Sequence, residues 1–292
     1  MVPLTIAAEE LCRRYEALYT GAVNDVLRER GLLYQTLPNS IMPLRDEMRV
    51  AGIAFTVKGA KNLTVEGEME HRAEMLEALH PNSVVVWDTS QDDESAQWGE
   101  VMTKAAIHAG CRGAVVDGGV RDTLQVLAQD FPVFCRYRSS NGMLGRFRMI
   151  DYQIPVQLGG VTIQPGDVVF GDIDGVLLIP RALACDVLFR AEEIRREEQT
   201  YKKWIDQGML IDPDSYDRTM NALKEAESMS GIKKMFSKMF TKTTPEKTSV
   251  AAGSMTSISM EEEAAMAVQK KKHDFKDLQR LDDFIRELEA NV

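Results

Sequence analysis

The feature that most constrains this chain is a short motif, Gly118-Gly119-Val120-Arg121-Asp122. It follows an apolar run at residues 114–116 that is typical of a buried strand, so we expect the strand to end in a glycine turn. That turn would present Arg121 and Asp122 side by side. A guanidinium binds a small carboxylate through two parallel N–H groups, and an aspartate oxygen suits Mg²⁺ or Mn²⁺. The motif therefore predicts a site that holds a 2-oxo acid against a divalent metal ion.

A second carboxylate lies upstream of the motif. Twenty residues lie between Glu100 and Arg121. We expect Glu100 near the N-terminal end of a helix over residues 96–109, where it would bind a metal-bound water for general acid–base catalysis. An Arg-Asp pair after a glycine turn is also common as a simple loop ion pair. The residue types alone leave both interpretations open.

Backbone groups complete the predicted site. The first turn of a helix has free N–H groups, so the amides of Val101 and Met102 are candidate donors to a substrate carboxylate or oxo oxygen. Gly118 and Gly119 carry no side chain, which would let a ligand or metal-bound water approach closely. We therefore count all four among the candidate substrate-binding residues, together with the arginine of the motif.

Length and composition narrow the classes of function. A chain of 292 residues with 44% apolar residues has enough material for one domain with a real core and for appended segments. Its net charge of −10 argues against a nucleic-acid-binding protein, although local arginines can still bind an anionic substrate. No apolar run approaches the ~18 residues of a membrane span, and residues 1–15 lack a secretory core. The four cysteines are scattered without zinc spacing, so we expect reduced thiols in a cytoplasmic protein.

Alternating strand and helix patterns predict a mixed α/β core. Thr20 is predicted to cap a helix that Gly31 ends, within a helical region over residues 5–30. Further helices are expected over residues 66–79, 96–109, 123–129 and 181–204. Strands are expected over residues 49–58, 84–87, 114–116, 132–134, 168–172 and 176–180, and on both sides of Gly159-Gly160, with a loop over residues 139–148.

Other residues offer weaker candidates. Asp172 and Asp174 resemble a metal pair, but the glycines around them favour a turn. Lys58 is a candidate Schiff-base lysine without a burial signal, and a strand end is the favoured interpretation. Arg136 and Arg138 are candidates for a distal substrate carboxylate, with solvent exposure as the favoured alternative.

The ordered set of motifs resembles the RraA-like family, which includes the class II 4-hydroxy-4-methyl-2-oxoglutarate/4-carboxy-4-hydroxy-2-oxoadipate aldolases. The resemblance covers roughly residues 5–205. Its core is residues 98–102 followed by residues 110–122, and the supporting stretches are residues 20–27, 50–58, 80–86, 131–134, 159–167 and 171–180. The set is specific as a whole, whereas each piece alone is weak.

The resemblance assigns roles to the motif residues. It implies that Arg121 binds the pyruvoyl carboxylate and that Asp122 is the direct protein ligand of the metal. Glu100 matches the acid that orients metal-bound water, which is an aspartate in the characterised aldolases, so its longer side chain departs from the pattern. Val101 and Met102 match the pyruvate-binding amides. A further acid is expected from the C-terminal part of a neighbouring subunit, and the candidates are Glu193, Glu197 and Glu198, unless they only form a solvated helix face.

The resemblance also implies a fold and an activity. The expected fold is a compact αββα-type sandwich with a helical C-terminal extension, assembled as a homotrimer or homohexamer with sites between subunits. The expected function is a divalent-metal-dependent lyase that cleaves a 4-hydroxy-2-oxo acid to pyruvate by retro-aldol chemistry, with oxaloacetate decarboxylation as a related activity. The alternative is a non-catalytic RraA-like interaction or regulatory protein that acts through its C-terminal tail, because the family also contains ribonuclease E inhibitors. These inhibitors lack the metal-site aspartate, so Asp122 favours the enzyme.

The resemblance stops before the C-terminal segment. We expect a catalytic domain over residues 1–205, a helical appendage over 206–240, a flexible linker over 241–260 and an amphipathic helix over 261–292. Residues 229–242 are cationic and amphipathic. Such a segment can bind a protein partner or an anionic membrane surface, or it can pack against the core.

Overall fold

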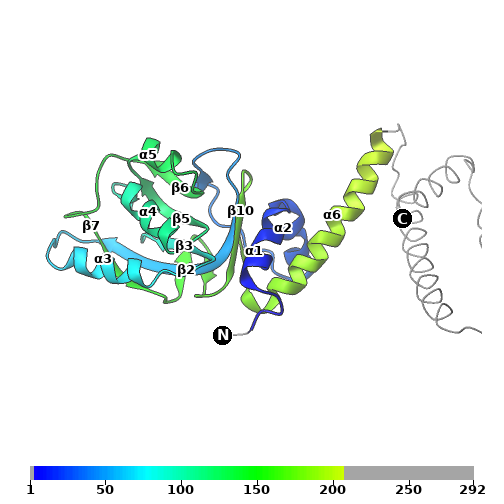
Figure 1. Cartoon of the computed structure of the whole chain (residues 1–292), viewed down its shortest axis with the longest axis horizontal. Coiled ribbons are helices and arrows are strands. Elements are labelled where there is room, and N and C mark those ends of the chain that lie inside the picture. The colour runs from blue at the N-terminus through cyan, green and yellow to red at the C-terminus, as the bar shows by residue number, and fades with distance from the viewer. Residues whose placement is uncertain (1–2, 207–292) are drawn as a thin grey trace, which may run out of the picture. The chain divides into compact units, whose positions relative to one another are not determined.

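The computed structural model describes residues 3–206 of the chain (Figure 1). The chain divides into two units, Met1–Ile211 and Asp212–Val292, and the described residues belong to the first. The expected linker and C-terminal helix lie outside the described residues, as does the expected appendage apart from its first residue. The boundaries given for these segments therefore stay predictions.

Nine strands form one strongly curved sheet, in the order β1-β6-β5-β3-β2-β10-β11, with β4 beside β5 and β7 beside β2. The strands β2, β3, β5 and β6 run parallel, and β10 runs antiparallel to β2 and β11. The bounds are β1 Met42–Pro43, β2 Val50–Lys61, β3 Ser83–Asp88, β4 Ala96–Trp98, β5 Gly113–Val120, β6 Val133–Arg138, β7 Phe147–Tyr152, β10 Val168–Asp172 and β11 Gly175–Ile179.

The sheet nearly closes into a barrel. The N–H of Leu37 donates to the carbonyl of Val176, and the N–H of Leu178 donates to the carbonyl of Gln35, both at 2.9 Å, so the segment before β1 pairs with β11. A hairpin of β8 (Val156–Leu158) and β9 (Val161–Ile163) contributes its inward side chains to the apolar interior. The interior is therefore a packed core between two walls of the sheet.

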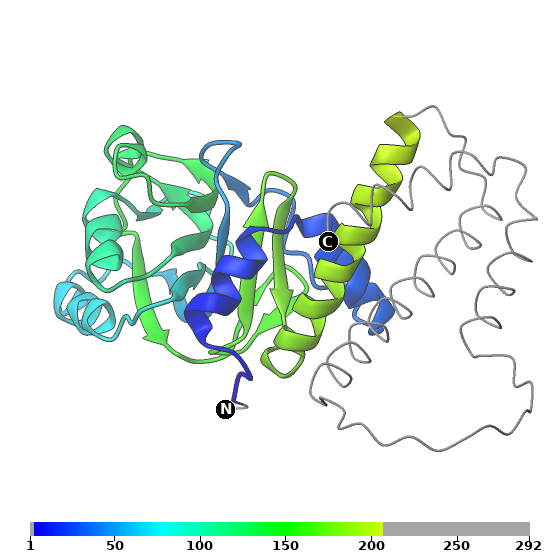
Figure 2. The same ribbon diagram turned by 45° about the vertical axis from the view of Figure 1, so that its right-hand side comes forward.

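Helices cover both outer faces (Figures 1 and 2). On one side lie α3 (Glu68–Glu77), α4 (Glu100–His108) and α5 (Thr123–Leu127), which share an apolar cluster with β2, β3 and β5. On the other side lie α1 (Ala8–Glu16), α2 (Thr20–Glu29) and α6 (Ala184–Asp206), which follows a short 3₁₀ turn at Arg181–Leu183. The order helix, sheet wall, sheet wall, helix confirms the expected mixed α/β sandwich. Among residues 3–206, no helix combines the length and apolar character that crossing a membrane requires.

Two local predictions are wrong in a way that matters for the site. The helix expected over residues 96–109 begins only at Glu100, because residues 96–98 form the short strand β4, which pairs with β5. The expected glycine turn is absent, because β5 continues through Gly118 and Gly119 to Val120. Both glycines are buried inside the strand. The turn that presents the motif's charged residues therefore comes later, at Asp122.

Two further predictions need correction. Thr20 does not cap α2: Tyr19 holds the N-cap position, and the hydroxyl and N–H of Thr20 both donate to the carboxylate of Asp172 at 2.8 Å. The loop expected over residues 139–148 ends early, because β7 begins at Phe147. Gly31 does end α2 as predicted, with φ of 77°, a left-handed conformation that glycine adopts without strain.

Candidate functional site

The short strand β4 brings the predicted site residues together. It runs parallel to β5, so the carboxyl ends of both strands lie at the same edge of the sheet. The N–H of Arg121 donates to the carbonyl of Trp98 at 3.0 Å, which extends the pairing by one residue. Since α4 begins directly after Gly99, Glu100 lies next to the end of β5. Glu100 and Arg121 are therefore neighbours in space, although they are twenty-one positions apart in the sequence.

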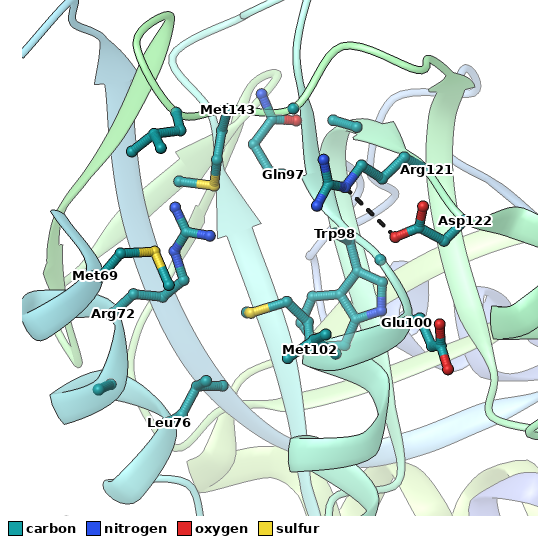
Figure 3. A pocket seen from close by; sticks show the side chains of 16 residues that line it. Met69, Arg72, Leu76, Gln97, Trp98, Glu100, Met102, Arg121, Asp122 and Met143 are labelled. Carbon is teal, nitrogen blue, oxygen red and sulfur yellow. Dashed lines mark ion pairs between the residues drawn. The ribbon is translucent and has the colours of Figure 1, made fainter. Parts of the chain in front are cut away.

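A cavity of about 370 Å³ opens at this edge (Figure 3). Its volume lies in the range of ~300–1,000 Å³ that is usual for small-molecule sites. Charged side chains line it together with a largely apolar wall that is rich in methionine. The lining side chains drawn and labelled in Figure 3 are those of Met69, Arg72, Leu76, Gln97, Trp98, Glu100, Met102, Arg121, Asp122 and Met143.

Asp122 has an unusual backbone conformation. Its φ of 52° and ψ of 37° lie in the left-handed region, which only a few per cent of non-glycine residues adopt and which favours aspartate and asparagine. The turn places its Oδ2 3.4 Å from Nε of Arg121, while both side chains remain accessible at 40% and 49%. A Cβ at Gly99 would lie 2.9 Å from the same Oδ2, so a glycine there leaves room for the carboxylate.

Glu100 begins α4 and is among the residues that line the cavity. Nζ of Lys104, one helical turn later, lies 2.6 Å from its Oε1. The first backbone hydrogen bond of the helix runs from the N–H of Thr103 to the carbonyl of Gly99. The N–H groups of Val101 and Met102 precede that bond and have no carbonyl partner within the helix. They are placed where the sequence predicted anion-binding donors.

The donor set fits a hard divalent cation with few protein ligands. Among the described residues, no three His, Cys, Asp or Glu side chains form a group that could hold a metal ion. Mg²⁺ commonly takes one or two carboxylates and keeps several waters. Asp122, with Glu100 lining the same cavity, matches that requirement.

The two predicted glycines, unlike the other predicted site residues, do not line the cavity. Gly118 and Gly119 lie in β5 behind the cavity wall. A side chain on Gly118 would collide with the amide oxygen of Gln97, and one on Gly119 would collide with the ring of Tyr137. The space beside them is filled by the protein's own side chains, and a role in substrate binding stays a prediction.

The weaker candidates all lie outside the cavity lining. Asp172 accepts hydrogen bonds from Thr20 and from the N–H of Asp174, as a turn residue does. Nζ of Lys58 lies 2.7 Å from Asp88. Arg136 pairs with the buried Asp117 at 2.8 Å, whose carboxyl pKa is raised by burial. Arg138 donates to the carbonyl of Leu44 at 3.3 Å. The three candidate glutamates, Glu193, Glu197 and Glu198, lie on α6, across the sheet from the cavity.

Sequence reasoning missed one charged residue of the cavity, Arg72 on α3. Its Nη2 lies 2.8 Å from Oε1 of Glu68, a carboxylate that is only 1% exposed and that also pairs with Arg148 at 3.5 Å. Figure 3 shows Arg72 across the cavity from Arg121. The only sequence signal is a glutamate four residues before an arginine, which ordinarily indicates no more than a helix-stabilising pair.

The sequence of this chain is similar to those of known proteins. The family model RraA-like, described as Aldolase/RraA, matches residues 20–178, more than half of the chain. A protein of Halalkalibacterium halodurans named "Putative 4-hydroxy-4-methyl-2-oxoglutarate aldolase" is 30% identical over 199 residues, which are 68% of this chain and 89% of that protein. The protein DlpA of Legionella pneumophila is 30% identical over 184 residues, 63% of this chain but only 29% of its own length.

Solved structures show the same architecture. A crystal structure described as one of novel cellulases from microbes associated with the gut ecosystem is 54% identical, with a TM-score of 0.66 over 68% of this chain and 90% of that chain. An uncharacterized protein of Pseudomonas syringae pv. tomato is 29% identical, with a TM-score of 0.61 over 71% and 97% of the two chains. RraAS2 of Streptomyces coelicolor, at 24% identity and a TM-score of 0.61 over 66% and 97%, shares the fold.

Proposed function

Because this chain belongs to the RraA-like family, we propose that it is a divalent-metal-dependent lyase that cleaves a 4-hydroxy-2-oxo acid to pyruvate by a retro-aldol reaction. The observation that carries the proposal is the pairing of Arg121 and Asp122 at the mouth of one cavity, with both side chains accessible. A relative that is 30% identical over 89% of its length carries an aldolase name, which supports this class of reaction.

Arg121 would bind the substrate's carboxylate. Its guanidinium can donate two parallel hydrogen bonds to the acid, which fixes both the position and the plane of the oxo-acid group. The free N–H groups of Val101 and Met102 would add donors from the start of α4, where the helix dipole favours negative charge. These contacts orient the bond to be broken before any chemistry occurs.

Asp122 would hold Mg²⁺ or Mn²⁺, with Glu100 on its water shell. When bound, such an ion polarises the 2-oxo group as a Lewis acid. Cleavage breaks the C3–C4 bond, removes the proton of the 4-hydroxyl and later returns a proton to C3. Glu100 is the candidate that would accept and return a proton through water, and its carboxylate pairs with Lys104 one helical turn later.

The far end of the cavity suggests how a second acid group would bind. Arg72 lies across the cavity from Arg121, so a substrate with two carboxylates could contact both guanidinium groups. This residue replaces Arg136 and Arg138 as the candidate for the distal carboxylate, because neither of those lines the cavity. The same arrangement suits oxaloacetate, which also has two carboxylates. Its decarboxylation, like the retro-aldol reaction, moves the electrons of the broken C–C bond toward the 2-oxo group.

An assembled protein would complete the site. The glutamates expected to supply a third acid pair locally on α6: Glu193 and Glu197 with Arg190, and Glu198 with Lys202. Within one chain they lie across the sheet from the cavity, so any contribution to a site must come from a neighbouring copy. We therefore propose a homotrimer or homohexamer.

The test is pyruvate release from a panel of substrates, measured with Mg²⁺, with Mn²⁺ and after EDTA treatment. The panel should hold 4-hydroxy-4-methyl-2-oxoglutarate, a monocarboxylic 4-hydroxy-2-oxo acid, oxaloacetate and a cello-oligosaccharide as the contrasting class. We expect metal-dependent pyruvate from oxo acids and no sugar release. No turnover of any oxo acid, together with metal-independent binding of a partner that is lost when residues 206–292 are deleted, would favour the non-catalytic interaction protein instead.

A further inference from the structure

Gln97 occupies an unusual place in the cavity wall. It lies on β4, its side chain is only 2% exposed, and both ends of its amide are engaged. Nε2 donates to Oδ2 of Asp92 at 2.7 Å, and Oε1 accepts from the N–H of Gly119 at 2.9 Å. The side chain therefore bridges a buried carboxylate and the strand that carries the motif.

The bridge explains why β5 carries glycine at a central position. A Cβ at Gly118 would collide with Oε1 of Gln97 and approach Thr89. Glycine inside a strand weakens it and commonly marks a close approach of another group. Here the approaching group is the Gln97 amide, which reaches the backbone of β5 only because no side chain stands in its way.

Asp92 fixes the orientation of that amide. It is 1% exposed, and its Oδ2 also accepts from the N–H of Ser95 at 2.9 Å. The backbone carbonyl of Asp92 accepts from the hydroxyl of Tyr137 at 3.1 Å and from Arg136, which holds the residue in place. The N–H of Gly119 on the other side is a donor, so it requires the amide oxygen of Gln97 as its acceptor. The amide orientation in which Nε2 faces Oδ2 of Asp92 and Oε1 faces β5 is therefore the one that satisfies both contacts.

The bridge acts on the residues that define the site. Gly119 precedes Arg121 by two positions, and Trp98, the residue after Gln97, accepts the N–H of Arg121 at 3.0 Å. One buried side chain thus ties the end of β4, from which Glu100 starts, to the end of β5. Without it, the hydrogen bonding between the two strand ends would be reduced to short backbone pairing that contains an irregular register.

We propose that Gln97, oriented by Asp92, is a positioning residue that sets the place of Arg121 relative to Glu100; this role rests on the proposed function. Neither residue needs to touch the substrate's reacting atoms. Their effect should appear in binding of the carboxylate, because a misplacement of about 1 Å can cost a binding or catalytic group a large part of its effect.

The first variant is Gln97→Met, which preserves the length of the side chain and removes both amide bonds. With pyruvate and Mg²⁺ as the probe, calorimetry should show a Kd raised about 10-fold, and KM should rise more than kcat falls. Val86→Ala, a cavity-forming change inside the barrel, is the control for lost stability, and it should leave Kd unchanged. A folded Gln97→Met protein with wild-type affinity overturns the proposal.

A charge cycle tests the role of Asp92. Gln97→Glu places two carboxylates against each other and should weaken pyruvate binding more than Gln97→Met does. Adding Asp92→Asn removes the repulsion, so the double variant should recover at least half of that loss on a logarithmic scale. If the double variant instead loses the sum of the binding free energies that Gln97→Glu and Asp92→Asn lose separately, the pairing of Asp92 with Gln97 is overturned.

A measurement on the unaltered protein decides the matter if the variants do not fold. The side-chain NH₂ signals of Gln97 in an NMR spectrum should shift when pyruvate and Mg²⁺ bind, whereas those of the exposed Gln157 should stay. Static Gln97 signals during saturable pyruvate binding overturn the positioning role alone. Wild-type protein that binds no pyruvate overturns the proposed function and, with it, this role.

Discussion

Nε of Arg121 lies 3.4 Å from Oδ2 of Asp122, although side chains of adjacent residues in a regular strand point to opposite faces. The left-handed backbone of Asp122, two residues after the end of β5, produces this arrangement, because it turns the carboxylate back toward the guanidinium. The guanidinium, which can bind a substrate carboxylate, and the aspartate, which can bind a metal ion, therefore line the same cavity.

Asp122→Asn and Arg121→Lys should separate the two roles. Asparagine tolerates the left-handed backbone, so Asp122→Asn should stay folded. Because it loses the proposed metal ligand, its metal-dependent kcat should fall by about 10²-fold or more. Arg121→Lys keeps the charge but loses the two-pronged contact, and KM should rise about 10-fold or more. Steady-state kinetics measure both effects. Arg13→Lys, on the exposed surface of α1, is the matched control, and a similar loss there would contradict the assignment.

Glu100 and Lys104 give a contrasting pair. Glu100→Gln should lower kcat by about 10²-fold or more, because a neutral amide cannot accept the proton, whereas Glu100→Asp should retain more activity. Lys104→Met removes an ion pair whose lysine side chain is 65% exposed, so it should change the free energy of unfolding by less than about 1 kcal/mol. Stopped assays of pyruvate and thermal unfolding measure these effects. Equal kcat for Glu100→Gln and wild type would exclude the proposed base.

Arg72→Gln tests the far end of the cavity. If Arg72 binds a distal carboxylate, the variant should raise KM about 10-fold for a dicarboxylic substrate and leave a monocarboxylic one nearly unchanged. Arg148→Gln is the matched control, because Arg148 pairs with the same Glu68 but does not line the cavity. The same KM change for both substrates would point to a packing role for Arg72.

His71 makes the contact between α3 and β7 dependent on pH. Its Nε2 lies 3.0 Å from the carbonyl of Ile150 and its Nδ1 lies 3.2 Å from Glu74; these contacts, the carbonyl first, raise the imidazole pKa above 6.5, while Arg148 opposes the shift. A raised folded-state pKa gives stability that is fully present below the unfolded value and is lost as pH rises through the folded value. Thermal unfolding of His71→Gln and wild type should therefore differ at about pH 5.5 and converge toward about pH 8.5. A difference that grows with pH would contradict this sign.

The cysteines should differ in reactivity. Burial raises the thiol pKa of Cys12 and Cys135 to about 11 and also raises that of Cys111. Cys185 is the partly exposed one of the four free cysteines. A thiol reagent at mildly alkaline pH should therefore modify Cys185 first in the native protein and all four after denaturation. Rapid modification of Cys12 in native protein would contradict the buried packing of α1.

The parts of the fold with strong hydrophobic periodicity could be predicted from the sequence. The long buried strands and the amphipathic helices were predictable because their apolar residues repeat over many positions. The short strand β4 was not, because three residues cannot display an alternating pattern and its pairing with β5 is a tertiary contact. The start of β7 was hidden for a similar reason, inside a polar segment that contains glycine.

The same limit applies to the site. Arg121, Asp122 and Glu100 were candidates from residue type, spacing and the family resemblance, and all three line one cavity in the structure. Gly118 and Gly119 look like a turn in sequence, because the pattern does not reveal that Gln97 and Tyr137 fill the adjoining space. The sequence around Arg72 indicated no more than a helix-stabilising pair with Glu68, since the place of Arg72 opposite the motif depends on how α3 packs.

The parallel pairing of β4 and β5 has a consequence for how related chains can vary in length. The residues from Glu100 to Arg121 comprise α4, its return loop and β5, so their number is set by the distance that this path must cover. Adding or deleting one residue inside α4 would rotate the helix by about 100° against the sheet. Insertions should therefore be tolerated around residues 62–66, which form an exposed connection outside the cavity lining, and excluded between the glutamate and the arginine.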